Sequence, residues 1–387
     1  MWKGGLARFR VSQSGAVYLE LFMVCHPSAY FCKVKTKVKR VYIYLATKYN
    51  SMQSKASTIK VGIIAYENCT SSMILGMMDI LSLANAQWPH FSPSSPAGAP
   101  PLFHVEIVTL SGKPVMSFNR YPITPHPSAK KDAKYDIIYV PGFLGDPEQV
   151  IGQQREVIAW LKQQYGSGRK LIAACNGNLL LAETGLLDGK KVTTHWSLIY
   201  FFTHRYTRIV LKPEKIIVDE GDIISAAGVS AYMNLALYLI AKYGSPELAS
   251  YCSKIFLVDS GRKVQTPYFV FTSPKNHGDE EIVKIQDWLE TNFKKPVSID
   301  TLTKTFNLGR RTLSRRFKTA TGDTPLEYLQ RLRIENAKRL LETSSHTFSE
   351  ITWDVGYNDI SSFQRLFSKS TGLTPGAYRK KFSMIEA

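Results

Sequence analysis

Cysteine is scarce in this sequence, and no pair of cysteines has metal-binding spacing. The 387 residues contain only Cys25, Cys32, Cys69, Cys175 and Cys252. An odd, scattered set does not form a disulfide framework, and it lacks the Cys/His clusters that hold zinc. We therefore expect free thiols in a reducing cytoplasm, with neither a metal nor a cofactor.

Long apolar runs are also missing. The apolar stretch Ile223–Ala241 has no charged residue, but it contains Ser225, Gly228, Ser230 and Asn234. A helix that crosses a membrane needs about 20 mostly apolar residues. We therefore interpret this stretch as a strand that leads into a buried helix, and we expect no membrane partner.

Acidic side chains are in deficit, with 31 Asp and Glu against 49 Lys and Arg. Residues 1–55 carry 10 basic side chains and one acidic side chain, whereas residues 276–387 carry 18 and 14. Much of the excess therefore lies in a basic N-terminal extension, so the net charge alone is weak support for DNA binding. Because residues 1–55 differ in composition from the rest, we hypothesise that translation starts at or near Met52 and that the preceding residues are not native.

The sequence does contain an internal repeat. Leu313–Tyr328 and Phe363–Tyr378 are aligned copies, each of which ends one helix at a glycine and starts another at Thr-Pro. Two such units held rigidly apart can enter successive turns of a DNA groove, which predicts sequence-specific binding of double-stranded DNA. The identical positions are Arg315/Arg365, Phe317/Phe367, Thr321/Thr371, Gly322/Gly372, Thr324/Thr374, Pro325/Pro375 and Tyr328/Tyr378.

Residues 59–271 alternate between strand and helix patterns. Short apolar runs at Ile59–Tyr66, His104–Leu110, Asp136–Val140 and Lys170–Cys175 suit buried strands. Helical spacing follows several of them, for instance over residues 147–165. This rhythm predicts an α/β domain with a mostly parallel sheet and helices on both faces.

After a predicted linker at Thr272–Gly278, the pattern becomes wholly helical over residues 279–384. Seven helices are expected, arranged as two helix-turn-helix units on either side of a connecting helix at Leu326–Glu342. In the first unit, Leu313 and Phe317 should anchor the recognition helix Arg310–Thr319.

Basic and amide side chains near the start of each recognition helix can reach base edges or phosphates. Arginine can bind guanine, glutamine can bind adenine, and isoleucine can contact a thymine methyl group. For any single arginine, a phosphate contact or an internal salt bridge is the alternative. The candidate DNA-binding residues are Arg310, Arg311, Ser314, Arg315, Ile360, Ser361, Gln364 and Arg365.

Residues 280–383 resemble the DNA-binding domain of AraC/XylS-type regulators. Thr303 and Thr352 stand where that family usually has alanine, and Gly309 replaces the usual Ser/Thr cap. The resemblance rests on Leu302, Leu313, Arg315, Phe317, Gly322, Thr324, Pro325, Tyr328, Arg333, Ala337, Leu340, Leu341, Ile351, Gly356, Tyr357, Phe363, Arg365, Phe367, Gly372, Thr374, Pro375, Tyr378 and Arg379.

Residues 59–271 resemble the intracellular-protease/glutamine-amidotransferase superfamily, on Gly76–Leu81 and Ala173–Trp196. The whole chain resembles the GlxA-type regulators, which join such a domain to AraC-type helices. This likeness implies a pocket for a small-molecule effector, amino-acid-derived or a quaternary amine. The candidate pocket residues are Asp79, Cys175, Asn176, His195 and Trp196.

Cys175 is the sharpest candidate for chemistry. It lies between a predicted strand and a predicted helix, so we expect an exposed thiol whose pKa is lowered by the helix dipole. However, Asn176 stands where enzymatic relatives often have histidine, and the acid usual near Met73 is missing. The prediction is therefore a sensor and not an enzyme.

Together these features predict a cytoplasmic, homodimeric transcription regulator, with RNA polymerase as a further candidate partner. A cysteine hydrolase or glyoxalase-like enzyme that uses Cys175 and a DNA-tethering tail is one alternative. An architectural protein with little sequence discrimination is another. The α/β domain could also be a purely structural dimerisation domain, with His195 and Trp196 as core packing and Asp79 on a solvated helix surface.

Overall fold

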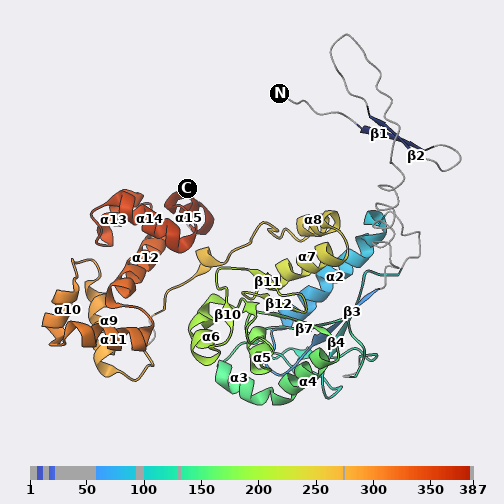
Figure 1. Ribbon diagram of the computed structural model, residues 1–387, viewed down its shortest axis with the longest axis horizontal. Helices are drawn as coiled ribbons and strands as arrows, with labels where there is room; N and C mark the ends of the chain where they lie inside the picture. Colours follow the sequence, from blue (N-terminus) through green and yellow to red (C-terminus); the bar gives the residue numbers. More distant parts are fainter. Residues whose placement is uncertain are drawn as a thin grey trace, which may run out of the picture. The chain divides into compact units, whose positions relative to one another are not determined.

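The computed structural model describes residues 7–11, 17–21, 58–92, 100–129, 132–272 and 275–383 (Figure 1). Most of the predicted extension 1–55, including Met52, lies outside the described residues. The chain divides into one unit over Met1–Ala56 and a second over Ser57–Ala387. In the first unit, β1 (Ala7–Val11) pairs antiparallel with β2 (Val17–Leu21).

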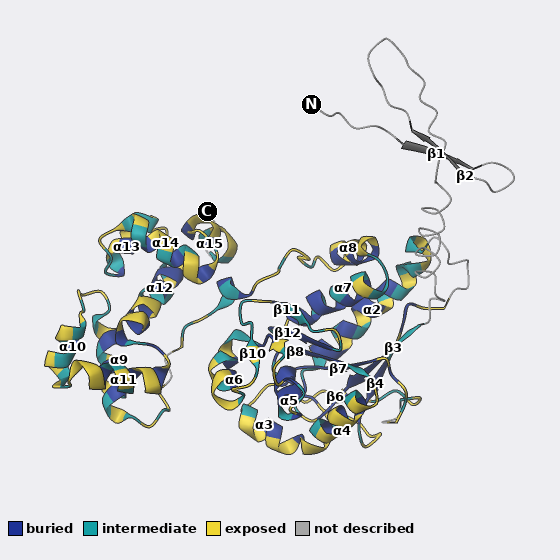
Figure 2. Cartoon of the chain, in the orientation of Figure 1, coloured by how far each residue is buried: buried dark blue, intermediate teal, exposed yellow. Residues whose placement is uncertain are grey.

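A six-stranded sheet lies at the centre of the α/β region, in the order β11-β12-β8-β7-β3-β4 (Figure 1). All neighbouring strands pair in parallel except β11 and β12, so the predicted mostly parallel sheet is confirmed. Every residue of β7 and β12 is buried (Figure 2). The strands are β3 (Ile59–Ile64), β4 (Phe103–Val108), β7 (Ile137–Val140), β8 (Lys170–Ala174), β11 (Ile217–Asp219) and β12 (Ile223–Ala226).

Helices cover both faces of this sheet (Figure 1). On one face lie α2 (Ser71–Phe91), α7 (Ala231–Tyr243) and α8 (Pro246–Ile255). On the other lie α3 (Pro147–Gln153), α4 (Arg155–Gly166) and α5 (Gly177–Glu183). The single helix predicted over residues 147–165 is wrong, because the helix is interrupted at Gln154. The buried side chain of Gln154 donates a hydrogen bond to the Glu67 carbonyl (3.4 Å).

The remaining short elements of this region were not predicted, because two- and three-residue strands and turns leave no periodic pattern. The short elements are β5 (Val115–Met116), β6 (Pro122–Ile123), β9 (Lys191–Val192), η1 (Trp196–Leu198), α6 (Ile199–Arg205), β10 (Val210–Leu211) and η2 (Thr266–Tyr268).

The C-terminal region is wholly helical where it is described, as predicted. It has two hydrophobic cores, and one long helix contributes to both: Tyr328, Leu329 and Leu332 belong to the first core, whereas Ile334, Ala337 and Leu341 belong to the second. The limits 59–271 and 279–384 of the two predicted domains remain predictions. The helices are α9 (Glu280–Asn292), α10 (Ile299–Phe306), α11 (Arg310–Thr321), α12 (Pro325–Thr343), α13 (Phe348–Asp354), α14 (Ile360–Thr371) and α15 (Pro375–Phe382).

Candidate DNA-binding surface and effector site

The two helix-turn-helix units are built around equivalent aromatic pairs. Phe317 of α11 meets the edge of Tyr328 at a ring-centroid distance of 5.3 Å, and Phe367 of α14 meets Tyr378 at 5.4 Å. All four rings are buried. The Tyr328 hydroxyl donates to Glu290 (2.9 Å) and the Tyr378 hydroxyl to Glu342 (2.6 Å). The repeat therefore reproduces a polar contact as well as an apolar core.

The ends of α11 and α14 are equally alike. Thr321 donates its hydroxyl to the carbonyl of Phe317 (2.8 Å), and Thr371 does the same to Phe367 (2.9 Å). Gly322 (φ 82°) and Gly372 (φ 74°) follow in the left-handed conformation, which glycine adopts without steric cost. Thr324 and Thr374 then cap the next helices. Six of the seven identical positions thus build the scaffold.

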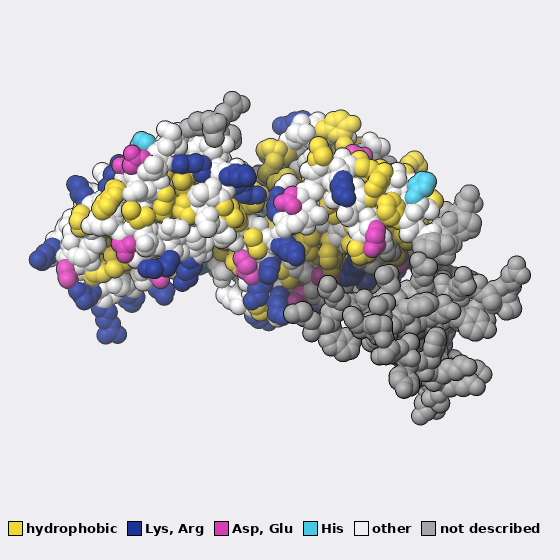
Figure 3. Space-filling model, turned by 90° about the horizontal axis from the view of Figure 1, so that it is seen from above, with side chains coloured by type: hydrophobic (Ala, Val, Ile, Leu, Met, Phe, Trp, Pro, Cys, Tyr) yellow, Lys and Arg dark blue, Asp and Glu magenta, His cyan; other side chains and the backbone are white. Residues whose placement is uncertain are grey.

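The seventh identical position carries the arginines, and both Arg315 and Arg365 are exposed. Of the other candidates, Arg310, Arg311, Ser361 and Gln364 are exposed, whereas Ser314 and Ile360 are half-buried. Lys and Arg side chains stand out along the outer edge of the helical region in Figure 3. An outward face on each recognition helix is what base or phosphate contact requires.

Two neighbouring arginines are already paired within the protein. Arg310 lies 2.7 Å from Asp300, but both side chains are about two-thirds exposed, with 68% and 65% of their surface accessible. Arg316 is bound more firmly, since its guanidinium donates to both carboxylate oxygens of Asp279 (2.6 and 3.0 Å). Because these hydrogen bonds lower the pKa of Asp279, the internal salt-bridge alternative describes Arg316 well.

The prediction that Cys175 is exposed with a lowered pKa is wrong. The residue does occupy a sharp strand-to-helix turn, with φ 56°, yet only 3% of its surface is accessible. Burial raises the pKa of its thiol from 9.0 to about 12. Gly142 lies against it, since a Cβ atom on Gly142 would be 3.1 Å from the Cys175 Cβ. Desolvation therefore outweighs the dipole of α5, which has only seven residues.

The other candidate pocket residues are only partly brought together. The Cys175 thiol donates to the Asn176 side chain (3.3 Å), and Asn176 donates in turn to the Phe143 carbonyl (3.2 Å). His195 packs on Trp196 with ring centroids 4.9 Å apart, and burial lowers its pKa. Asp79 is exposed on α2. Among the described residues, no hydrogen bond joins Cys175 to His195 or Asp79.

Two polar residues that matter structurally were not singled out from the sequence. Gln265 is only 3% exposed and Lys338 only 5%. Neither belongs to a motif, and both donate hydrogen bonds to main-chain carbonyls. No residue pattern in the sequence could therefore have predicted them. Glu290 and Glu342, which accept from Tyr328 and Tyr378, were not singled out either, because they lie 38 and 36 residues before these tyrosines and the ungapped repeat does not align them.

Both halves of the chain match known families. Residues 302–381 match the helix-turn-helix domain, and residues 102–242 match the DJ-1/PfpI family. The chain joins a DJ-1/PfpI domain to an AraC-type helix-turn-helix domain. Both resemblances predicted from the sequence are therefore confirmed. In the part of the chain that the structure describes, no group of three or more His, Cys, Asp or Glu residues could hold a metal ion.

The chain is similar to named relatives over different parts of its length. The chain is 26% identical over 307 residues to the HTH-type transcriptional regulator GbdR of Pseudomonas aeruginosa, covering 78% of this chain and 82% of that protein. It is 35% identical over 104 residues to the HTH-type transcriptional activator RhaS of Salmonella paratyphi B, covering 27% and 37%. A crystal structure of an AraC family transcriptional regulator from Pseudomonas putida is 22% identical, with a TM-score of 0.43 and coverage of 51% and 99%.

Proposed function

We propose that a small-molecule effector, bound in the DJ-1/PfpI domain, controls how this DNA-binding transcriptional regulator engages its operator. One observation carries the DNA-binding half of the proposal: equivalent scaffolds present Arg315 and Arg365 on the outer faces of α11 and α14. In this proposal the protein acts in the cytoplasm as a homodimer, with RNA polymerase as a further partner. No helix among the described residues is long and apolar enough to span a membrane.

The surroundings of Cys175 favour a sensor over an enzyme. A nucleophilic cysteine needs an adjacent base or a lowered pKa. Here burial raises the thiol pKa to about 12, and the described hydrogen-bond partner of the thiol is the amide of Asn176. His195 instead accepts hydrogen bonds from Ser197, through its backbone N–H at 3.2 Å, with the Ser197 hydroxyl 2.7 Å away. These features support ligand binding, with an amino-acid-derived compound or a quaternary amine as the first class to test.

DNA recognition is tested by selecting a preferred duplex from random sequences and measuring binding of the full chain. Arg315→Ala and Arg365→Ala should each weaken binding to the selected site by about 1–3 kcal/mol if they read guanine. Arg208→Ala is the matched control, since it removes an arginine whose side chain is 80% exposed on the α/β region. If wild-type protein binds random DNA as tightly as the selected site, it is an architectural protein and not a specific regulator.

Effector binding is tested by titrating amino-acid-derived and quaternary-amine compounds into the full chain by calorimetry. Trp196→Ala should weaken any binding that depends on the wall formed by His195 and Trp196. The enzyme alternative makes a different prediction. If Cys175→Ala abolished turnover of a compound and left DNA binding and regulation unchanged, the α/β domain would be catalytic.

A further inference from the structure

The segment Lys263–Phe271, called the strap below, begins as an added edge of the α/β region. Val264 forms an antiparallel bridge with Lys215. The Ile216 N–H donates to the Lys263 carbonyl (3.1 Å), and the Gln265 N–H donates to the Glu214 carbonyl (2.9 Å). The first three residues of the strap are therefore held by main-chain hydrogen bonds.

Gln265 inserts its side chain into the α/β core directly behind the candidate effector residues. Its amide nitrogen donates to the Thr194 carbonyl (2.7 Å), and Thr194 immediately precedes His195. Among the described residues, the Gln265 side-chain oxygen and the Thr194 hydroxyl are both buried without a hydrogen-bond partner. An unsatisfied buried polar group costs about 1–3 kcal/mol, so this attachment is poised for rearrangement.

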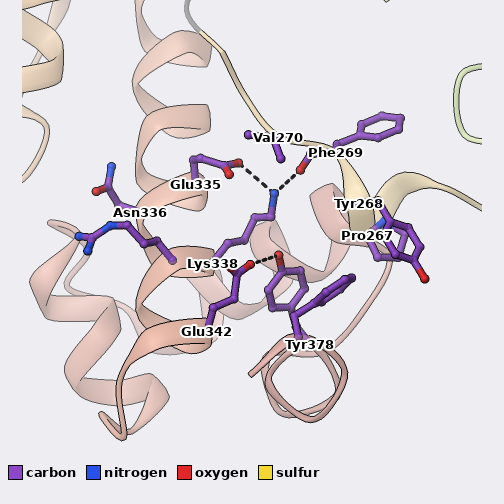
Figure 4. A pocket seen from close by; sticks show the side chains of 11 residues that line it. Pro267, Tyr268, Phe269, Val270, Glu335, Asn336, Lys338, Glu342 and Tyr378 are labelled. Atoms are coloured by element: carbon purple, nitrogen blue, oxygen red, sulfur yellow. Dashed lines mark hydrogen bonds and ion pairs between the residues drawn. The ribbon is translucent and has the colours of Figure 1, made fainter. Parts of the chain in front are cut away.

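The other end of the strap is held by α12 (Figure 4). The side chain of Lys338 is only 6% exposed, and its ammonium donates to the Phe269 carbonyl and pairs with Glu335 at 2.9 Å. Glu335 also accepts a hydrogen bond from the Phe271 N–H (3.2 Å). Lys338 and Glu335, which lie one turn apart on α12, thus form an ion pair that binds both a carbonyl and an N–H of the strap.

Strap side chains reach the cores of both helix-turn-helix units. Tyr268 meets Phe382 of the second unit edge-on, with ring centroids 5.3 Å apart. Phe271 meets Tyr328 of the first unit in the same way, at 5.1 Å. The strap therefore contacts both helix-turn-helix units and the helix α12 that belongs to both cores.

We propose that the strap couples the effector site to the DNA-reading helices. A change at Thr194–Trp196 shifts Gln265, and the shift reaches α12 through the bonds that Lys338 and Glu335 make to the strap. A pocket of about 420 Å³ beside these residues gives the strap room to move. If the strap detaches from α12, Lys338 keeps Glu335 as its partner, which limits the free-energy cost of detachment. This coupling rests on the proposed function, because it presumes effector control of DNA binding.

The test measures hydrogen–deuterium exchange of the full chain without DNA or effector. Lys338→Met and Gln265→Met each remove polar contacts at one end while keeping side-chain length. We expect each variant to raise exchange at least tenfold at both ends, at Gln265 and at Phe271. Lys242→Met is the control, since it removes another partly buried ion-paired lysine, bound to Asp219 on the α/β region, and it should leave the strap unchanged.

If each variant raises exchange only at its own end, the strap does not transmit and the proposal fails. A second measurement compares the affinity for DNA that carries the full selected site with the affinity for DNA that carries one half-site, which is the part read by one recognition helix. Loosening the strap should weaken full-site binding at least fivefold more than half-site binding, whereas equal losses would contradict coupling. Absence of any preferred sequence for the wild-type chain would instead refute the proposed function, and the exchange result would stand apart from it.

Discussion

At the scale of single residues, Cys175 illustrates what a sequence motif leaves undetermined. The strand-to-helix position was predicted correctly, and the residue has a left-handed backbone conformation, with φ 56°. Its chemistry depends on burial, which leaves only 3% of its surface accessible and in which Gly142, from another part of the chain, lies against it. Local sequence specifies the turn, whereas tertiary packing sets the pKa.

Alkylation should therefore be slow at Cys175. Raising the pKa from 9.0 to about 12 lowers the thiolate fraction near neutral pH by about a thousandfold. We expect iodoacetamide to modify Cys175 in the folded chain at least that much more slowly than in guanidinium-unfolded chain, with the rate still rising above pH 9. Peptide mass spectrometry measures this, and rapid modification that levels off below pH 8 would contradict the burial.

The repeat illustrates the opposite case at this scale, because its residues could be interpreted from sequence alone. Leu313 and Phe317 were expected to anchor the first recognition helix, and both are buried. Arg315 and Arg365 were expected to face outward, and both are exposed. Which base or phosphate each arginine meets is not specified by this pattern, since a guanidinium suits both.

At the scale of elements, apolar periodicity predicted the helices well and the segments that connect them poorly. Ile282, Ile285 and Leu289 lie on the buried face of α9, as their spacing indicates. The strap was missed because its contacts involve the carbonyl of Phe269 and the N–H of Phe271, and main-chain bonds leave no side-chain pattern. The predicted linker thus follows a segment that is already attached to α12.

The two ends of α11 should respond in opposite ways to substitution. Gly322 has φ 82° with no atom within 4 Å of an added Cβ, so Gly322→Ala should destabilise the chain by about 1 kcal/mol through backbone strain alone. Gly309 caps the other end at φ −63°, so Gly309→Ser should stabilise by a few tenths of a kcal/mol. Urea unfolding followed by circular dichroism measures both, and equal shifts in one direction would refute the assignment.

At the scale of the whole molecule, α12 joins the two helix-turn-helix units. It supplies Tyr328 and Leu332 to one core and Ala337 and Leu341 to the other. An uninterrupted helix keeps both recognition helices at a fixed offset, and successive turns of a DNA groove are about 34 Å apart. The sequence predicted this connecting helix, with ends within one residue of those of α12.

Spacing changes in the operator should therefore be poorly tolerated. Inserting about 5 base pairs, half a duplex turn, between the two half-sites should reduce affinity to that of one half-site. Inserting about 10 base pairs should not restore it, because a rigid α12 cannot lengthen. Electrophoretic mobility shifts with the three duplexes make the comparison, and recovery at the longer insertion would indicate a flexible connection.

Because one helix contributes to both cores, a stop codon that removes everything after Thr343 would do more than delete the second helix-turn-helix unit. Ile334, Ala337 and Leu341 would lose their cover and become a solvent-facing apolar stripe. We expect such truncated chains to aggregate or be degraded before they can occupy operators. Late nonsense mutations in this gene should consequently be recessive, because the truncated chain does not interfere with the protein made from the intact allele.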